Sequence, residues 1–174
     1  VQVWSRILQH VPGSKMLVEG KDFSNPGATL QLRRQFGQYG IESDRLIFVQ
    51  RDTRRQYLVY HDIDIALDTF PLTGGTTTFD CLWMGVPIVS LVGRNFRERL
   101  STTILYHGGF QEFLCTNADQ YIERAVALAA NVGALADRRS RQRTRMQGSV
   151  LMDEPRFVRL FGQALRMIWQ AWCK

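Results

Sequence analysis

Apolar residues follow two alternating spacings along the chain, and this alternation predicts buried strands separated by helices. Short, continuous apolar runs are typical of strands inside a sheet, and they occur at residues 15–19, 45–50, 63–67, 87–92 and 113–115. Apolar residues at helical spacing predict helices at residues 1–11, 26–40, 53–60, 76–84, 97–107, 118–130, 133–146 and 155–172. Strands joined by long helices need crossover connections, so the sequence predicts an α/β fold with a mostly parallel sheet and helices on both faces.

The last predicted helix has a continuous apolar face. The residues in helical register are Phe157, Leu160, Phe161, Leu165, Ile168 and Trp172. We expect this face, with Trp169 beside it, to pack against protein rather than to recognise a ligand.

Length and composition are those of one full-sized globular domain. The chain has 174 residues, of which 45% are hydrophobic and 22% charged. No apolar run approaches the length of a membrane span, and the residues after Val1 do not form a signal peptide. A chain that opens inside a helical pattern indicates a piece of a longer protein. The three cysteines have no metal-like spacing and favour a reducing cytoplasm, with Cys81 expected to be a small buried hydrophobe.

The net charge of +6 raises the question of nucleic-acid binding, and the distribution of the charge argues against it. The densest basic cluster is Arg138, Arg139, Arg141, Arg143 and Arg145. These positions cover several faces of a predicted helix, and no aromatic residues lie between them to stack on bases. We therefore expect a solvated helix surface and neither a nucleic-acid nor a membrane partner.

The candidate chemistry lies between Asp68 and Pro87. Gly74 and Gly75 follow a predicted strand, and three threonines, Thr76 to Thr78, then open a helix. Free backbone N–H groups and hydroxyls at a helix start suit an anion, and ligands of parallel sheets bind beyond the carboxyl ends of the strands. Asp80 follows one turn later, where a carboxylate suits a sugar hydroxyl. This layout fits a nucleotide diphosphate, although an ordinary strand-to-helix turn with a capping threonine would also explain it.

The same stretch carries a resemblance to a known family. The run Leu67-Asp-Thr-Phe-Pro, then Gly-Gly-Thr-Thr-Thr, then Leu-Trp-Met-Gly-Val-Pro87 resembles the catalytic region of O-GlcNAc transferases, and in particular their SPINDLY-like and bacterial members. The opening Trp4-Ser-Arg-Ile-Leu8 and the segment from Gly93 to Arg99 are similar as well. The resemblance covers most of the chain.

The resemblance implies that residues 1–174 are the C-terminal, Rossmann-like lobe of a two-lobed GT-B glycosyltransferase, a three-layer domain. The family transfers N-acetylglucosamine from UDP-GlcNAc to Ser or Thr of acceptor proteins, and some SPINDLY-type members use GDP-fucose. It further implies a cytoplasmic enzyme with tetratricopeptide helical repeats upstream. The terminal helix, about 155–173, would pack toward the N-terminal lobe, and one lobe alone would be inactive.

Individual site residues are carried over from the family motif. Thr76 and Thr77 match the threonines that contact the diphosphate, with Gly75 and Thr78 beside them, and Asp80 matches the residue that binds the ribose. Gly75 stands where the animal enzymes have a histidine. The base-binding loop would include Thr53, Arg54 and Gln56. The phosphate-binding lysine and the catalytic base would lie outside this chain, so no catalytic residue is assigned here.

Neither a metal nor a cofactor is expected. Asp62 and Asp64 form the only Asp-x-Asp pair, and they precede a strand rather than follow it. For two further polar residues we expect structural roles: His61 in loop packing, and Asp68 in hydrogen bonding to the loop that follows it. The rival function is a non-catalytic lobe that serves as a protein-interaction surface; a nucleic-acid binder ranks well below both.

Overall fold

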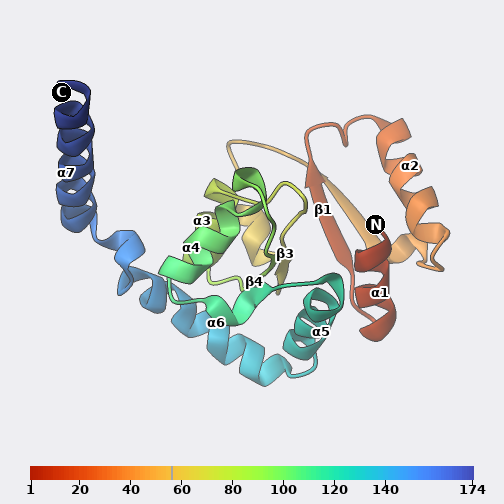
Figure 1. Ribbon diagram of the computed structural model, residues 1–174. Coiled ribbons are helices and arrows are strands. Elements are labelled where there is room, and N and C mark those ends of the chain that lie inside the picture. The colour runs from red at the N-terminus through yellow and green to blue at the C-terminus, as the bar shows by residue number, and fades with distance from the viewer. Residues whose placement is uncertain (56) are drawn as a thin grey trace.

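Two parallel sheets form the centre of the fold in the computed structural model, which describes residues 1–55 and 57–174 (Figure 1). Strand β1 (Met16–Gly20) pairs with β2 (Leu46–Gln50) along its whole length. The second sheet has the order β3-β4-β5, from β3 (Ala66–Leu67), β4 (Ile88–Leu91) and β5 (Leu114–Cys115). All three pairings are parallel, as the sequence predicts.

The helices are α1 (Gln2–His10), α2 (Pro26–Gly37), α3 (Thr76–Trp83), α4 (Leu100–His107), α5 (Ala118–Ala129), α6 (Val132–Gln147) and α7 (Glu154–Trp172). Three of them, α2, α3 and α4, lie in connections between strands, α1 precedes β1, and α5, α6 and α7 follow β5. Short 3₁₀ turns lie at Ser43–Arg45, Leu58–His61, Phe96–Glu98, Gln111–Phe113 and Val150–Met152. The start of α2 is capped as expected, because the side chain of Asn25 accepts a hydrogen bond from Gly27 N.

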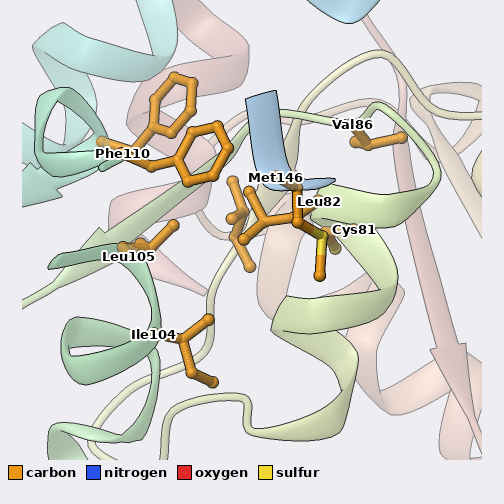
Figure 2. Close-up of a cluster of buried hydrophobic side chains, with 9 residues drawn as sticks. Cys81, Leu82, Val86, Ile104, Leu105, Phe110 and Met146 are labelled. Atoms are coloured by element: carbon orange, nitrogen blue, oxygen red, sulfur yellow. The ribbon is translucent and has the colours of Figure 1, made fainter. Parts of the chain in front are cut away.

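Helices cover both faces of the β3-β4-β5 sheet, which confirms a three-layer arrangement. Neighbouring residues of β4 point to opposite faces: Ile88 belongs to one buried cluster and Val89 to another. The Ile88 cluster is formed by α3, α4 and α6 (Figure 2) and includes Leu82, Leu105, Phe110 and Met146. The Val89 cluster is formed by α5 and α1 and includes Tyr121, Ile122 and Ile7. Helix α1 also packs, through Leu8, against Phe36 and Leu46 beside the first sheet.

Two predicted elements differ from the structure. Strand β3 begins at Ala66 rather than at Ile63, because the carbonyl of Ile63 accepts a hydrogen bond from the Arg139 side chain instead of from a neighbouring strand. No α-helix forms in the described part of 53–60. There the Asp52 side chain accepts a bond from Arg54 N at 2.9 Å, a local turn that competes with a helix start, and only the 3₁₀ turn Leu58–His61 follows.

Helix α7 forms as predicted, but its apolar face does not pack within the described chain. All of its residues are exposed, including Trp169 and Trp172, and it extends away from the other elements (Figure 1). These tryptophans therefore do not pack within residues 1–174, and the expectation that α7 packs toward another lobe stays a prediction. None of the described helices has the length and apolar character that a bilayer span requires.

Candidate functional site

The glycine and threonine loop joins the carboxyl end of β3 to the start of α3. A second loop, from Gly93 to Arg99, follows the carboxyl end of β4, the neighbouring strand. The two loops are joined, since Thr73 N donates to the carbonyl of Arg97 at 3.2 Å. The candidate site therefore lies at the edge of the sheet where ligands of parallel sheets bind.

Asp68 is buried beneath this loop, with 5% of its surface exposed. Its Oδ1 accepts from Gly74 N at 2.8 Å, and its Oδ2 accepts from the Ser90 hydroxyl at 2.6 Å. Its main-chain carbonyl accepts from the Tyr121 hydroxyl at 2.8 Å. Burial raises the pKa of the Asp68 carboxyl above its usual value of 3.8, and the bonds from Ser90 and Gly74 oppose that rise. The expectation that Asp68 bonds to the loop is confirmed.

The position of Gly74 admits only glycine without local movement. A Cβ atom at this residue would lie 2.5 Å from Thr77 Oγ1 and 2.8 Å from Thr78 Oγ1. Its carbonyl accepts from the Ser101 hydroxyl at 2.7 Å. The first turn of α3 is therefore folded tightly back over the end of the loop.

The start of α3 has no side-chain cap among the described residues. Gly75 is the N-cap, and its carbonyl accepts from Thr78 N at 3.0 Å. Thr76 and Thr77 are both exposed. The capping-threonine alternative is therefore not what forms, and Thr76 and Thr77 lie exposed in the first turn, at the positive end of the helix dipole.

Thr78 differs from its two neighbours, because it is fully buried. Its hydroxyl donates to the Ser101 hydroxyl at 2.8 Å, because the one proton of Ser101 goes to the Gly74 carbonyl. Of the candidate diphosphate residues, the structure thus brings Gly75, Thr76 and Thr77 to the surface and places the Thr78 side chain behind them.

Asp80 lies one turn beyond these threonines and is half-buried. Desolvation raises the pKa of its carboxyl, and the positive charge of Arg51 opposes the rise. Arg51 directly follows β2, so the loop predicted to bind the base lies near the carboxylate predicted to bind the ribose. The nearby thiol of Cys81 is buried as predicted, and burial raises its pKa to about 12, which leaves it protonated and unreactive.

The predicted base-binding residues are only partly described. Thr53 and Arg54 are exposed, and they lie in the turn that Asp52 forms. Gln56 lies outside the described residues. Their closeness to Arg51 in the chain places Thr53 and Arg54 in the same loop as the group that faces Asp80.

Nothing in the described part of the chain groups three or more His, Cys, Asp or Glu side chains around a metal position. Asp62 and Asp64 are both exposed, and Asp64 pairs with Arg139 at 3.4 Å. This pairing ties the end of the Asp-x-Asp run to α6 and away from the glycine loop.

The arginines of α6 make ion pairs and hydrogen bonds that a simple solvated helix surface does not predict. Arg138 and Arg145 pair with Glu112, and Arg143 donates to the carbonyl of Trp83. A cavity of about 510 Å³ lies along this helix, and the arginines that line it, Arg138, Arg141 and Arg145, are all paired with carboxylates. The candidate nucleotide site lies elsewhere, at the carboxyl edge of the β3-β4-β5 sheet.

Three supporting residues could not be found from the sequence. Ser90, Ser101 and Tyr121 contact the Asp68 to Thr78 segment from β4, α4 and α5. No spacing rule connects them to the glycines, because the contacts arise only when the elements pack.

Comparisons with known proteins agree with the fold. The profile of the family described as Glycosyl transferase family 41 matches residues 1–160. The SPINDLY protein of Arabidopsis thaliana, described as a probable UDP-N-acetylglucosamine–peptide N-acetylglucosaminyltransferase, is 35% identical over 100% of this chain and 19% of its own length. The Caenorhabditis elegans UDP-N-acetylglucosamine–peptide N-acetylglucosaminyltransferase is 25% identical over 98% of this chain and 15% of its own length.

A solved structure is also similar. A mutant O-GlcNAc transferase of Thermobaculum terrenum superposes with a TM-score of 0.89 at 30% identity, over 96% of this chain and 32% of that chain. The chain thus spans well under half of these relatives. Because the profile covers nearly all of it and the fold matches throughout, the chain belongs to glycosyl transferase family 41, as a GT-B lobe of the O-GlcNAc transferase type.

Proposed function

We propose that residues 1–174 bind the nucleotide-sugar donor of a protein O-glycosyltransferase, which transfers N-acetylglucosamine from UDP-GlcNAc to Ser or Thr side chains. The observation that carries the proposal is the uncapped start of α3. It presents Thr76 and Thr77 outward, with Asp80 one turn away at the carboxyl edge of the sheet. The relatives named as UDP-N-acetylglucosamine–peptide N-acetylglucosaminyltransferases support the choice of donor and acceptor.

The chemistry of the helix start suits the diphosphate. Each favourable contact between an anion and the helix dipole contributes roughly 0.3–1 kcal/mol at an exposed site. The leaving nucleotide gains negative charge as the glycosidic bond breaks, so donors aimed at it stabilise the transition state more than the ground state. Gly75, Thr76 and Thr77 would supply these donors, and Thr78 would hold them in place.

The rest of the reaction would use residues outside this chain. In this proposal the catalytic base lies on the N-terminal lobe, the phosphate-binding lysine lies outside residues 1–174, just before the first helix of this lobe, and no metal takes part. The exposed apolar face of α7 would pack on that lobe, and residues 1–174 alone would not transfer sugar. The three free cysteines suit a reducing compartment, so we place the enzyme in the cytoplasm.

Titration of the ¹⁵N-labelled chain with UDP and with GDP tests the proposal, because NMR shifts report even weak binding. The amides from Gly75 to Asp80 should shift with one nucleotide. Asp80→Ala and Thr77→Val should weaken that binding, whereas Thr144→Val, at an exposed threonine of α6, should not. Preference for GDP would indicate a GDP-fucose donor instead. Shifts with neither nucleotide would contradict donor binding and favour a non-catalytic interaction lobe.

A further inference from the structure

Buried side chains hold Gly74 at both its backbone N–H and its backbone carbonyl. We call the Asp68 and Ser101 contacts that do so the clamp. The Asp68 carboxylate accepts from its N–H at 2.8 Å, and the Ser101 hydroxyl donates to its carbonyl at 2.7 Å. The two clamping residues come from different elements, the end of β3 and the first turn of α4. The orientation of Gly74, the residue before the N-cap of α3, is therefore fixed by tertiary contacts rather than by the loop alone.

The clamp continues into the helix that carries the outward-facing threonines. Ser101 bonds to Thr78 at 2.8 Å, and Thr78 N closes the first turn onto Gly75. Asp68 is in turn held by Ser90 at 2.6 Å and, through its carbonyl, by Tyr121. These bonds link the direction of the first-turn amides to β4, α4 and α5 at once.

None of the clamp side chains reaches the surface. Asp68 is 5% exposed, and Ser90, Ser101 and Thr78 are 0% exposed. They act on a bound anion only through the loop that covers them. Anion sites made of backbone N–H groups depend on preorganised direction, because a displaced amide loses both its hydrogen bond and its alignment with the charge.

We propose that Asp68, assisted by Ser101, is a positioning residue that sets the affinity of the α3 start for the diphosphate part of the donor. The inference rests on the proposed donor site. It predicts a selective loss: without the clamp the site binds a nucleoside diphosphate less well, while its affinity for the nucleoside alone is preserved. The nucleoside contacts would come from Asp80, further along α3, and from the loop after β2, and neither Asp68 nor Ser101 makes a hydrogen bond to the described residues of these groups.

A carboxylate behind an anion site is otherwise a poor choice, because it repels the ligand. Asparagine at this position would keep the same geometry without the charge, since its oxygen accepts from Gly74 N and its amide donates to Ser90. The role that we assign to Asp68 is thus geometric, and the two substitutions Asp68→Ala and Asp68→Asn separate geometry from charge.

The test measures dissociation constants of the chain for UDP and for uridine by NMR titration. In Asp68→Ala we expect the affinity for UDP to fall roughly tenfold, on the scale of one lost hydrogen bond, with uridine affinity within about twofold. Asp68→Asn should retain the UDP affinity, and Ser101→Ala should show the same selective loss. Phe36→Leu, at a buried residue of α2 that packs with Leu8 and Leu46 away from the clamp, should lower stability but keep the ratio of the two affinities.

The outcomes separate the two proposals. A wild-type chain that binds UDP no better than uridine would contradict the diphosphate site itself. A wild-type preference for UDP that persists in Asp68→Ala and Ser101→Ala would overturn the positioning role alone. If Asp68→Ala does not fold, Ser101→Ala and Asp68→Asn decide: an unchanged ratio in the first, or a lost preference in the second, counts against the clamp.

Discussion

The hydroxyls of Thr78 and Ser101 lie 2.8 Å apart in a buried hydrogen bond that joins the start of α3 to the start of α4. Thr77, one residue earlier, is exposed. Two adjacent threonines of one motif therefore differ in environment, with Thr78 inside the protein and Thr77 at the surface. In the proposed donor site, Thr78 has a structural role and Thr77 a binding role.

Replacing each threonine by valine should separate these roles. Thr78→Val leaves the Ser101 hydroxyl without this partner in a buried position, which should cost about 1–3 kcal/mol of unfolding free energy. Thr77→Val should change stability by less than about 0.5 kcal/mol, because the site is exposed, and should weaken nucleotide binding. Urea denaturation and nucleotide titration of both variants measure the two effects. Equal losses of stability in Thr78→Val and Thr77→Val would contradict the structural role assigned to the buried Thr78.

The two glycines should also respond differently to alanine. At Gly74 the new methyl group would meet Thr77 Oγ1 at 2.5 Å, so Gly74→Ala should lose about 1–3 kcal/mol of stability. At Gly75 the nearest atom is Leu100 Cδ1 at 4.0 Å, so Gly75→Ala should lose less stability. Its methyl group would occupy the open space before the helix start, and binding of UDP should weaken. Denaturation curves that rank the two variants in the opposite order would contradict this account.

Much of the fold was predictable because the spacing of the apolar residues and the turn residues between them indicate the same elements. The apolar runs around Leu17, Phe48 and Ile88 and the glycine and threonine loop all lie where spacing and turn chemistry predict. The parallel pairing also follows from helices long enough to cross between strands. The sequence likewise predicted that Asp68 bonds to the loop.

The remaining features depend on distant contacts that no local pattern reveals. The shortened β3 results from Arg139, far along the chain, bonding to Ile63. The turn at Asp52 prevails over the helical pattern that follows it, through one side-chain hydrogen bond. In α7 the local pattern predicted the helix correctly but not its surroundings. Its apolar face is exposed, and no surface of the described residues covers it. Ser101 became part of the site only through packing.

The pH dependence of stability should report the burial of Asp68. Its pKa is higher in the folded chain than the usual 3.8, so the folded state holds the proton more tightly than the unfolded state. The cost of the buried charge is absent below the unfolded pKa and grows as pH rises through the folded pKa. The stability of Asp68→Asn relative to wild type should therefore increase between about pH 3.5 and pH 7. Urea denaturation across this range measures the difference, and a decrease with pH would contradict the assigned direction.

Substitutions in α7 should leave the body of the domain unaffected. Phe161 is 54% exposed and Ile168 is 66% exposed, so Phe161→Ser and Ile168→Ser should each change unfolding free energy by less than about 0.5 kcal/mol. Leu105→Ala, at a residue with no exposed surface, should cost about 2–5 kcal/mol.

The serine variants should also reduce self-association in sedimentation experiments, because an uncovered apolar helix face promotes it. A loss of stability in Phe161→Ser as large as that in Leu105→Ala would mean that α7 folds back onto residues 1–153. Our proposal that α7 packs on the other lobe predicts that the same variants lose stability in a longer protein that carries that lobe.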